Sequence, residues 1–79
     1  MPRILSPKAR ILRPGLYEHY MGKRYHVIGV AFHSETFEEL VIYRETEGTR
    51  LFWLKPLEGF TETVEIYGER VPRFNYLNA

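Results

Sequence analysis

The chain has 79 residues, of which 44% are hydrophobic and 27% are charged, so it has room for one small globular domain. It contains no cysteine, which excludes a disulfide bond and a thiolate metal site. No apolar run reaches the about 18 residues that a membrane helix needs, and the first residues lack the apolar block of a secretory signal. We therefore expect a cytoplasmic protein with no membrane role.

The net charge of +1 is unevenly distributed. Residues 1–14 carry four basic side chains and no acidic one, whereas residues 15–79 carry seven basic side chains and ten glutamates. We predict a basic N-terminal tail over 1–14, either partly ordered or disordered, and a single small β-barrel domain over 15–79. The acidic domain lacks the basic excess of most nucleic-acid-binding surfaces, so a nucleic acid is the less favoured partner.

The predicted elements are short strands separated by tight turns. Three prolines argue against a continuous helix in the first 14 residues. The first long strand is apolar on both faces, which is typical of a central strand, and its Gly29 indicates a bend or bulge. The elements in chain order are the segment LYEHY after Gly15, strands over 25–33, 40–45 and 51–55 with a turn over 46–49, one helical turn at PLEGF after Pro56, and a hairpin over 63–74 with its bend at 67–70.

Five or six short antiparallel strands, with helices of one turn at most, predict an all-β domain. Closing such a sheet into a barrel removes the edges that would otherwise promote aggregation. We expect an SH3-like barrel. An OB-like barrel is the second choice, because that fold inserts a helix between strands and this chain has little room for one.

A series of motifs between residues 14 and 74 resembles a known bacterial family. The motifs are Tyr-x-His-Tyr at 17–20, His-Ser-Glu-Thr at 33–36, Trp-x-x-Pro-Leu-x-x-Phe at 53–60 and Val-Pro-Arg-Phe at 71–74. Their order resembles the family called domain of unknown function 1653. The resemblance implies a compact SH3-type barrel and no particular activity. The family usually has arginine before Pro-Leu, whereas this chain has Lys55, which offers a point charge in place of a bidentate contact.

The stretch HSETFEEL, residues 33–40, places a histidine, a serine and a glutamate in a row. Adjacent side chains of a strand face opposite ways, so His33 is badly placed to act as a base for Ser34. The chain also has no aspartate and no Gly-x-Ser-x-Gly elbow. Thr36 and Glu39 fit a capping box, which predicts one helical turn between the strands. We interpret the stretch mainly as a strand exit and a turn.

A small enzyme is the alternative function. His33 and Glu35 share one face of an extended chain, and with His19 they supply the two histidines and one carboxylate of many catalytic zinc sites. The alternative is therefore a metal-dependent or acid/base enzyme centred on these three residues. The favoured prediction nevertheless contains no catalytic residue, no metal and no cofactor.

The favoured function is a binding module that presents an aromatic and polar groove. Small barrels often use such grooves for peptides, nucleic acids or small polar molecules, and six tyrosines exceed what a core of this size needs. For each tyrosine the alternative is core packing, and for the basic residues it is pairing with glutamate. We expect a monomer or a weak homodimer. The candidate ligand-binding residues are Tyr17, His19, Tyr20, His33, Glu35, Tyr43, Trp53, Lys55 and Arg73.

Overall fold

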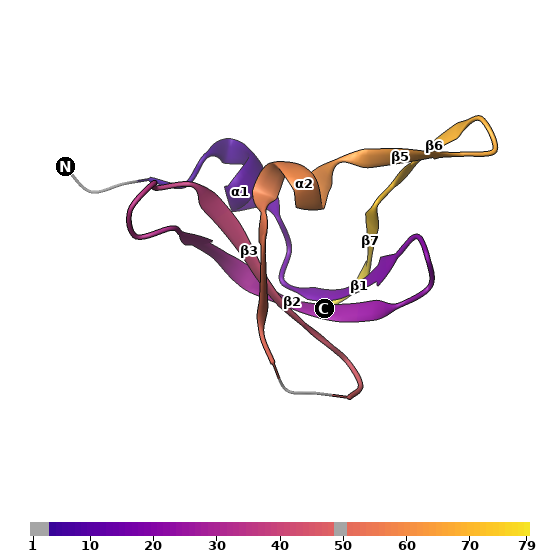
Figure 1. Cartoon of the computed structure of the whole chain (residues 1–79), viewed down its shortest axis with the longest axis horizontal. Coiled ribbons are helices and arrows are strands. Elements are labelled where there is room, and N and C mark those ends of the chain that lie inside the picture. Colours follow the sequence, from indigo (N-terminus) through magenta and orange to yellow (C-terminus); the bar gives the residue numbers. More distant parts are fainter. Residues whose placement is uncertain (1–3, 49–50) are drawn as a thin grey trace.

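The structure, a computed structural model, describes residues 4–48 and 51–79 of the chain (Figure 1). These residues form short helices and antiparallel strands, which confirms the all-β class, although the strand count is seven and not five or six. The elements are α1 Pro7–Ile11, β1 Gly15–His19, β2 Arg24–Phe32, β3 Glu39–Glu45, β4 Trp53–Pro56, α2 Leu57–Thr61, β5 Thr63–Ile66, β6 Glu69–Pro72 and β7 Phe74–Asn78.

Five strands make one antiparallel sheet in the order β4-β3-β2-β1-β7. The long strand β2 is central, as its two apolar faces predict. Its register with β3 shifts between Val27 and Gly29, which confirms the predicted bulge. Within the described residues β4 pairs only with β3 and β7 only with β1, so closure into an SH3-like barrel stays a prediction.

The other two strands, β5 and β6, form a hairpin that projects from the body (Figure 1). Its two-residue turn, Tyr67-Gly68, has positive φ at both positions, 49° and 81°, as the mirror-image turns of hairpins require. The predicted bend is thereby confirmed. The predicted elements end with this hairpin, and β7 was not predicted.

An aromatic core lies between α2 and the five-stranded sheet. Phe60 of α2 is 1% exposed, and its ring stacks on that of Phe74 in β7 with centroids 4.2 Å apart. The ring of Tyr17 meets Phe60 edge-on at 5.4 Å. Such pairs add stability beyond the area that they bury. The buried cluster comprises Ala9, Tyr17, Val27, Val41, Leu57, Phe60 and Phe74.

The N-terminal segment packs against this body through α1. Ser6 caps the helix by accepting a hydrogen bond from the Ala9 N–H, and Pro7 occupies a favoured position in the first turn. Glu39 of β3 accepts hydrogen bonds from both the backbone N–H and the hydroxyl of Ser6, at 2.6 and 2.7 Å. These bonds lower the pKa of the Glu39 carboxyl and hold Ala9 in the core. Residues 1–3 of the predicted tail lie outside the described residues.

The turn after His33 is not helical. The prediction of one helical turn at residues 36–39 is therefore wrong. The Nδ1 atom of His33 accepts hydrogen bonds from the N–H groups of Glu35 and Thr36, at 3.1 and 3.3 Å. Phe37 then adopts a φ of 62°, outside the helical region. Glu39 already belongs to β3 and binds the N-terminal segment, so it does not complete a capping box.

Candidate functional site

The nine predicted ligand-binding residues separate into different regions of the molecule. Tyr17 and Tyr43 lie in or beside the aromatic core, where burial raises the pKa of both hydroxyls. The Tyr17 hydroxyl donates to the carbonyl oxygen of Arg13 at 2.7 Å. Core packing, the alternative considered for each tyrosine, thus describes Tyr17, which is 5% exposed.

His33 and Glu35 lie at the opposite end of β2 from Tyr17 and His19. Tyr17 is directly opposite Tyr25, near the start of β2, because β1 pairs only with the first half of that strand. His33 follows the last residue of β2, eight residues beyond Tyr25, which is roughly 25 Å along an extended chain. The register therefore gives no support to a single groove that contains both His33 and Tyr17, and their joint site stays a prediction.

The register also separates the residues of the alternative enzyme. His19 is at the end of β1 beside the start of β2, whereas His33 and Glu35 follow the end of β2. Among residues 4–48 and 51–79 there is no group of three or more histidine or acidic side chains placed to hold a metal ion. A metal site at these three residues thus finds no support in the described part of the chain, and acid/base chemistry there stays a prediction.

Trp53 lies on a different part of the sheet, at the start of the edge strand β4. It is opposite Tyr43 and 48% exposed. A hollow of about 240 Å³ next to it is lined by Tyr25, Tyr43, Glu45 and Trp53. This hollow shares none of its lining residues with the surface around His19.

The structure brings together His19, Tyr20, Lys55 and Arg73. The imidazole of His19 lies 4.5 Å from the ring of Tyr20 and rests edge-on against Phe74 at 4.9 Å. The N–H of Tyr20 donates to the carbonyl oxygen of Arg73 at 3.0 Å, which joins the end of β1 to the start of β7. Lys55 points to the core side of β4 because it is opposite the fully buried Val41.

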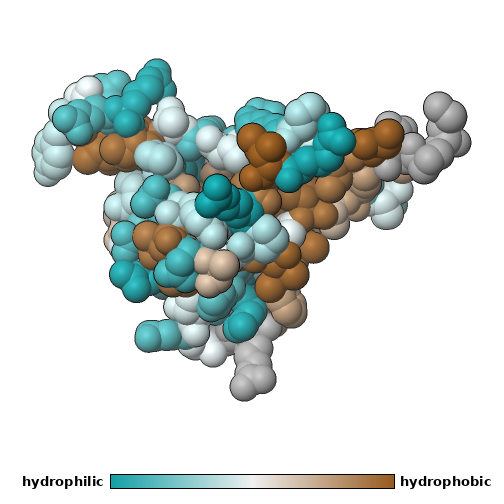
Figure 2. Space-filling model, turned by 180° about the vertical axis from the view of Figure 1, so that it is seen from behind, coloured by the Kyte–Doolittle hydropathy of each residue, from teal (hydrophilic) through white to brown (hydrophobic). Residues whose placement is uncertain are grey.

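A groove of about 470 Å³ opens beside His19, between the β1–β2 turn and the β5–β6 hairpin; we call it the His19 groove. Hydrophobic surface lies under the projecting hairpin, at the upper left of Figure 2. The walls that β5–β6 and β7 contribute were not predicted, although Val64 and Ile66 alternate with polar residues in the hairpin sequence. The groove is lined by Glu18, His19, Tyr20, Gly22, Ile66, Val71, Pro72 and Asn75.

Two basic side chains, Arg73 and Lys55, act on His19, although neither is among the residues that line the groove. Burial lowers the pKa of His19, and the nearby cations Arg73 and Lys55 lower it further. Arg73 donates through Nη2 to Glu62, while its buried Nε has no hydrogen-bond partner among the described residues. Lys55 forms no ion pair within the described part of the chain. We call His19, Lys55 and Arg73 the basic cluster.

We expect His19 to be neutral at pH 7 and to titrate below the ordinary histidine value of 6.5. Its Nδ1 accepts a hydrogen bond from the Met21 N–H at 3.1 Å, so the neutral ring carries its proton on Nε2. Because the unfolded chain binds this proton at higher pH, the stability contribution is complete above pH 6.5 and falls as the pH drops towards the folded pKa. NMR titration of the His19 ring protons measures the value directly. A midpoint at or above that of an unfolded control peptide would contradict the prediction.

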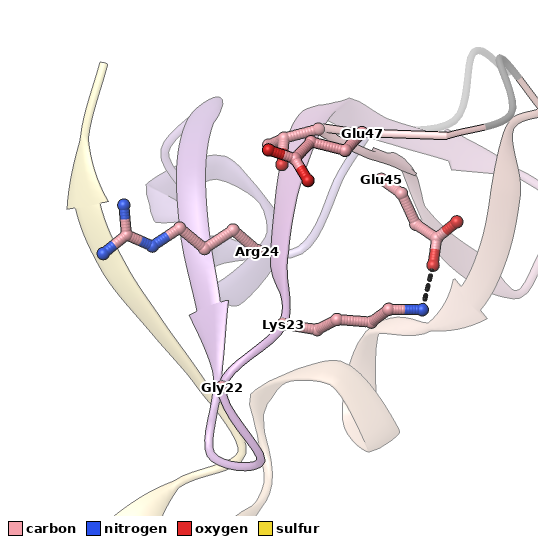
Figure 3. Close-up of a pocket in the computed structure, with 6 residues that line it drawn as sticks. Gly22, Lys23, Arg24, Glu45 and Glu47 are labelled. Carbon is pink, nitrogen blue, oxygen red and sulfur yellow. Dashed lines mark hydrogen bonds and ion pairs between the residues drawn. The ribbon is translucent and has the colours of Figure 1, made fainter.

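A second polar hollow, of about 260 Å³, lies between the β1–β2 turn and the end of β3 (Figure 3). Lys23 pairs there with Glu45, which raises the pKa of the lysine. Arg24 points away from this pair in Figure 3 and contacts Glu18 instead. Since its charges neutralise one another, this hollow is a weaker ligand site than the His19 groove.

Comparison with known proteins places the chain in a family. The model of a family described as "Protein of unknown function (DUF1653)" matches residues 15–76. The chain belongs to the DUF1653 family. The crystal structure of a DUF1653 protein from Bordetella bronchiseptica is similar to this DUF1653 chain, with 32% identity over 87% of this chain and 91% of the other and a TM-score of 0.79. A search of curated proteins found no match to this DUF1653 chain.

The family assignment confirms the resemblance seen in the sequence motifs and brings no activity with it. Among the described residues, no helix has the length and apolar character to span a bilayer. The function of this DUF1653 domain must be inferred from its surface. The His19 groove combines apolar walls with Lys55 nearby, which has no ion pair among the described residues.

Proposed function

We propose that this DUF1653 domain is a non-enzymatic binding module whose His19 groove takes the carboxyl-terminal end of a peptide. The observation that carries the proposal is the basic cluster beside an apolar-walled groove. His19, Lys55 and Arg73 lie close enough together for the two cations to lower the pKa of the imidazole. The absence of cysteine supports action in the reducing cytoplasm.

The charges favour a carboxylate as the ligand group. In the basic cluster only Arg73 has an acidic partner within the described residues, Glu62, and that bond uses one of its nitrogens. Lys55, which has no ion pair among the described residues, is available to an anion. A bound carboxylate would also stabilise protonated His19, so it would gain a third cation as the pH falls. Binding should therefore tighten as the pH falls through the His19 pKa.

The walls favour a peptide over a nucleic acid. Ile66, Val71 and Pro72 offer apolar surface to a side chain, and the Asn75 amide can bind a peptide group. Glu18 lines the same groove, where it would oppose the repeated charges of a phosphate backbone more strongly than the single carboxylate of a peptide end. The excess of glutamate over basic residues in the domain acts in the same direction.

A titration with two matched peptides tests the proposal. The probes are acetyl-alanyl-alanyl-leucine with a free carboxylate and the same peptide as its amide. NMR spectra of the labelled domain should show shifts at His19, Tyr20 and Val71 with the free acid. The amide should bind about tenfold more weakly, because a hydrogen-bonded charge typically contributes about 1.5–3 kcal/mol.

Two lysine variants locate the binding. Lys55→Gln should weaken binding of the free acid by about tenfold. Lys8→Gln, which removes an exposed lysine of α1 paired with Glu58, should leave it unchanged. No shift with either peptide, or equal affinity for the acid and the amide, would overturn the proposal.

A further inference from the structure

Four consecutive apolar residues are exposed where the chain enters β4. Leu51, Phe52 and Leu54 are each 61% exposed, and Trp53 is 48% exposed. Single exposed apolar side chains are common on monomers, but a contiguous run of this kind marks an interaction surface.

This run lies on an edge of the five-stranded sheet. β4 pairs with β3 on one side, and no other described strand pairs with its second side. Edge strands are normally protected by lysine, proline or a bulge. In β4 the protecting residues Lys55 and Pro56 come only at its end, after the exposed run.

The side chains of the run alternate between the two faces of the sheet. Trp53 is opposite Tyr43 and so lies on the core side, whereas Leu54 is opposite Ile42 and lies on the outer side. Because alternate residues of an extended chain share a face, Phe52 belongs with Leu54 on the outer side. Both faces of this edge are therefore apolar.

We propose that two copies of this chain associate through β4, as antiparallel neighbours centred on Trp53, so that their five-stranded sheets join. In this register Trp53 is opposite Trp53 of the partner subunit, and Phe52 is opposite Leu54 of the partner subunit. The pair of Phe52 with Leu54 therefore occurs twice, once on each side of the twofold axis. A twofold interface requires such self-complementarity.

The charges select this register. Antiparallel pairing centred on Trp53 sets Lys55 opposite Leu51 of the partner subunit, so no two cations face each other. Parallel pairing would set Lys55 beside the partner's Lys55, and like charges directly opposite are destabilising. A shift of the centre to Leu54 would place Lys55 opposite the partner's Trp53 and leave Phe52 opposite proline.

The exposed area is consistent with a weak dimer. Covering the four side chains in both copies would remove roughly 900 Å² from solvent, which is near the lower limit for specific interfaces. The hollow beside Trp53 gives the partner's side chains of the same run a place to pack. We therefore expect dissociation in the micromolar range and not a permanent dimer.

Analytical ultracentrifugation of the full chain between about 5 µM and about 500 µM tests the proposal. The wild type should shift from monomer to dimer over this range. The double variants F52K/L54K and F52E/L54E should each be monomeric, because each sets like charges opposite one another across the twofold axis. An equimolar mixture of the two should form a mixed dimer more readily than either variant alone. Circular dichroism checks that each variant is folded.

The control is Ile11→Lys, at a side chain of α1 that is 77% exposed and far from β4 in sequence. It should leave the dissociation constant unchanged, whereas each double variant should raise it by at least about tenfold. A wild type that stays monomeric at the highest concentration would overturn the proposal. Dimerisation that persists in folded F52K/L54K would also overturn it, by assigning association to another face.

Discussion

Phe60→Ala is expected to leave most of the domain unfolded at physiological temperature. Truncating a buried phenylalanine to alanine destabilises a protein by about 3–5 kcal/mol. A single core of this size rarely supplies more than about 3–5 kcal/mol in total. Phe60 is 1% exposed and contacts the rings of Tyr17, Tyr43 and Phe74, so its loss opens the centre of the core.

The same substitution should remove the support of the candidate site. Phe74 lies between Phe60, on which it stacks, and His19, which rests edge-on against it. Any folded fraction of Phe60→Ala should therefore bind the carboxylate peptide more weakly than the wild type. The basic cluster thus depends on the core, although its own residues are at the surface.

Thermal unfolding followed by circular dichroism measures the effect on stability. The matched control is Phe52→Ala, at low micromolar protein concentration, because Phe52 is 61% exposed. It should shift the midpoint by only a few degrees, since surface substitutions usually change stability by less than about 0.5 kcal/mol. Equal shifts for the two variants would show that Phe60 does not have the central role assigned to it.

Much of the fold follows from local signals in the sequence. β-Branched and aromatic residues predict β2 and β3, Gly29 predicts the bulge, and Tyr67-Gly68 predicts the turn of the projecting hairpin. Pro56 predicts the start of α2. In each case the structure of the element is determined by residues close together in the chain, so the local sequence is enough to predict it.

The candidate site was predicted only in part because its residues meet through long-range register. His19 and Arg73 are 54 positions apart and come together because β7, which was not predicted, pairs with β1. His33 shares a motif with glutamate and serine but is carried to the far end of β2 by the length of that strand. α1 is held by Glu39, a contact across 33 positions that no local pattern contains.

Gly15→Ala should destabilise the domain through the pairing of β1 with β7. Gly15 has a φ of 142°, which side chains rarely adopt, and a Cβ atom there would lie 2.5 Å from the carbonyl oxygen of Asn78. The backbone strain alone should lower the free energy of unfolding by about 1–3 kcal/mol. Relief of the clash requires the end of β7 to move away, which breaks the pair Leu16–Asn78.

Gly29→Ala is the matched control, and the two glycines should respond with opposite sign. A Cβ atom at Gly29 meets nothing within 4 Å, and its φ lies outside the left-handed region. Alanine there restricts the unfolded chain and should raise the free energy of unfolding by about 0.4–1 kcal/mol. Urea unfolding measures both changes, and hydrogen exchange shows whether the amides of β7 lose protection in Gly15→Ala.

Because β7 begins next to Arg73, a loosened β7 should also weaken binding of the carboxylate peptide. A Gly15→Ala variant as stable as the wild type would mean that the β1–β7 ladder does not hold the basic cluster in place.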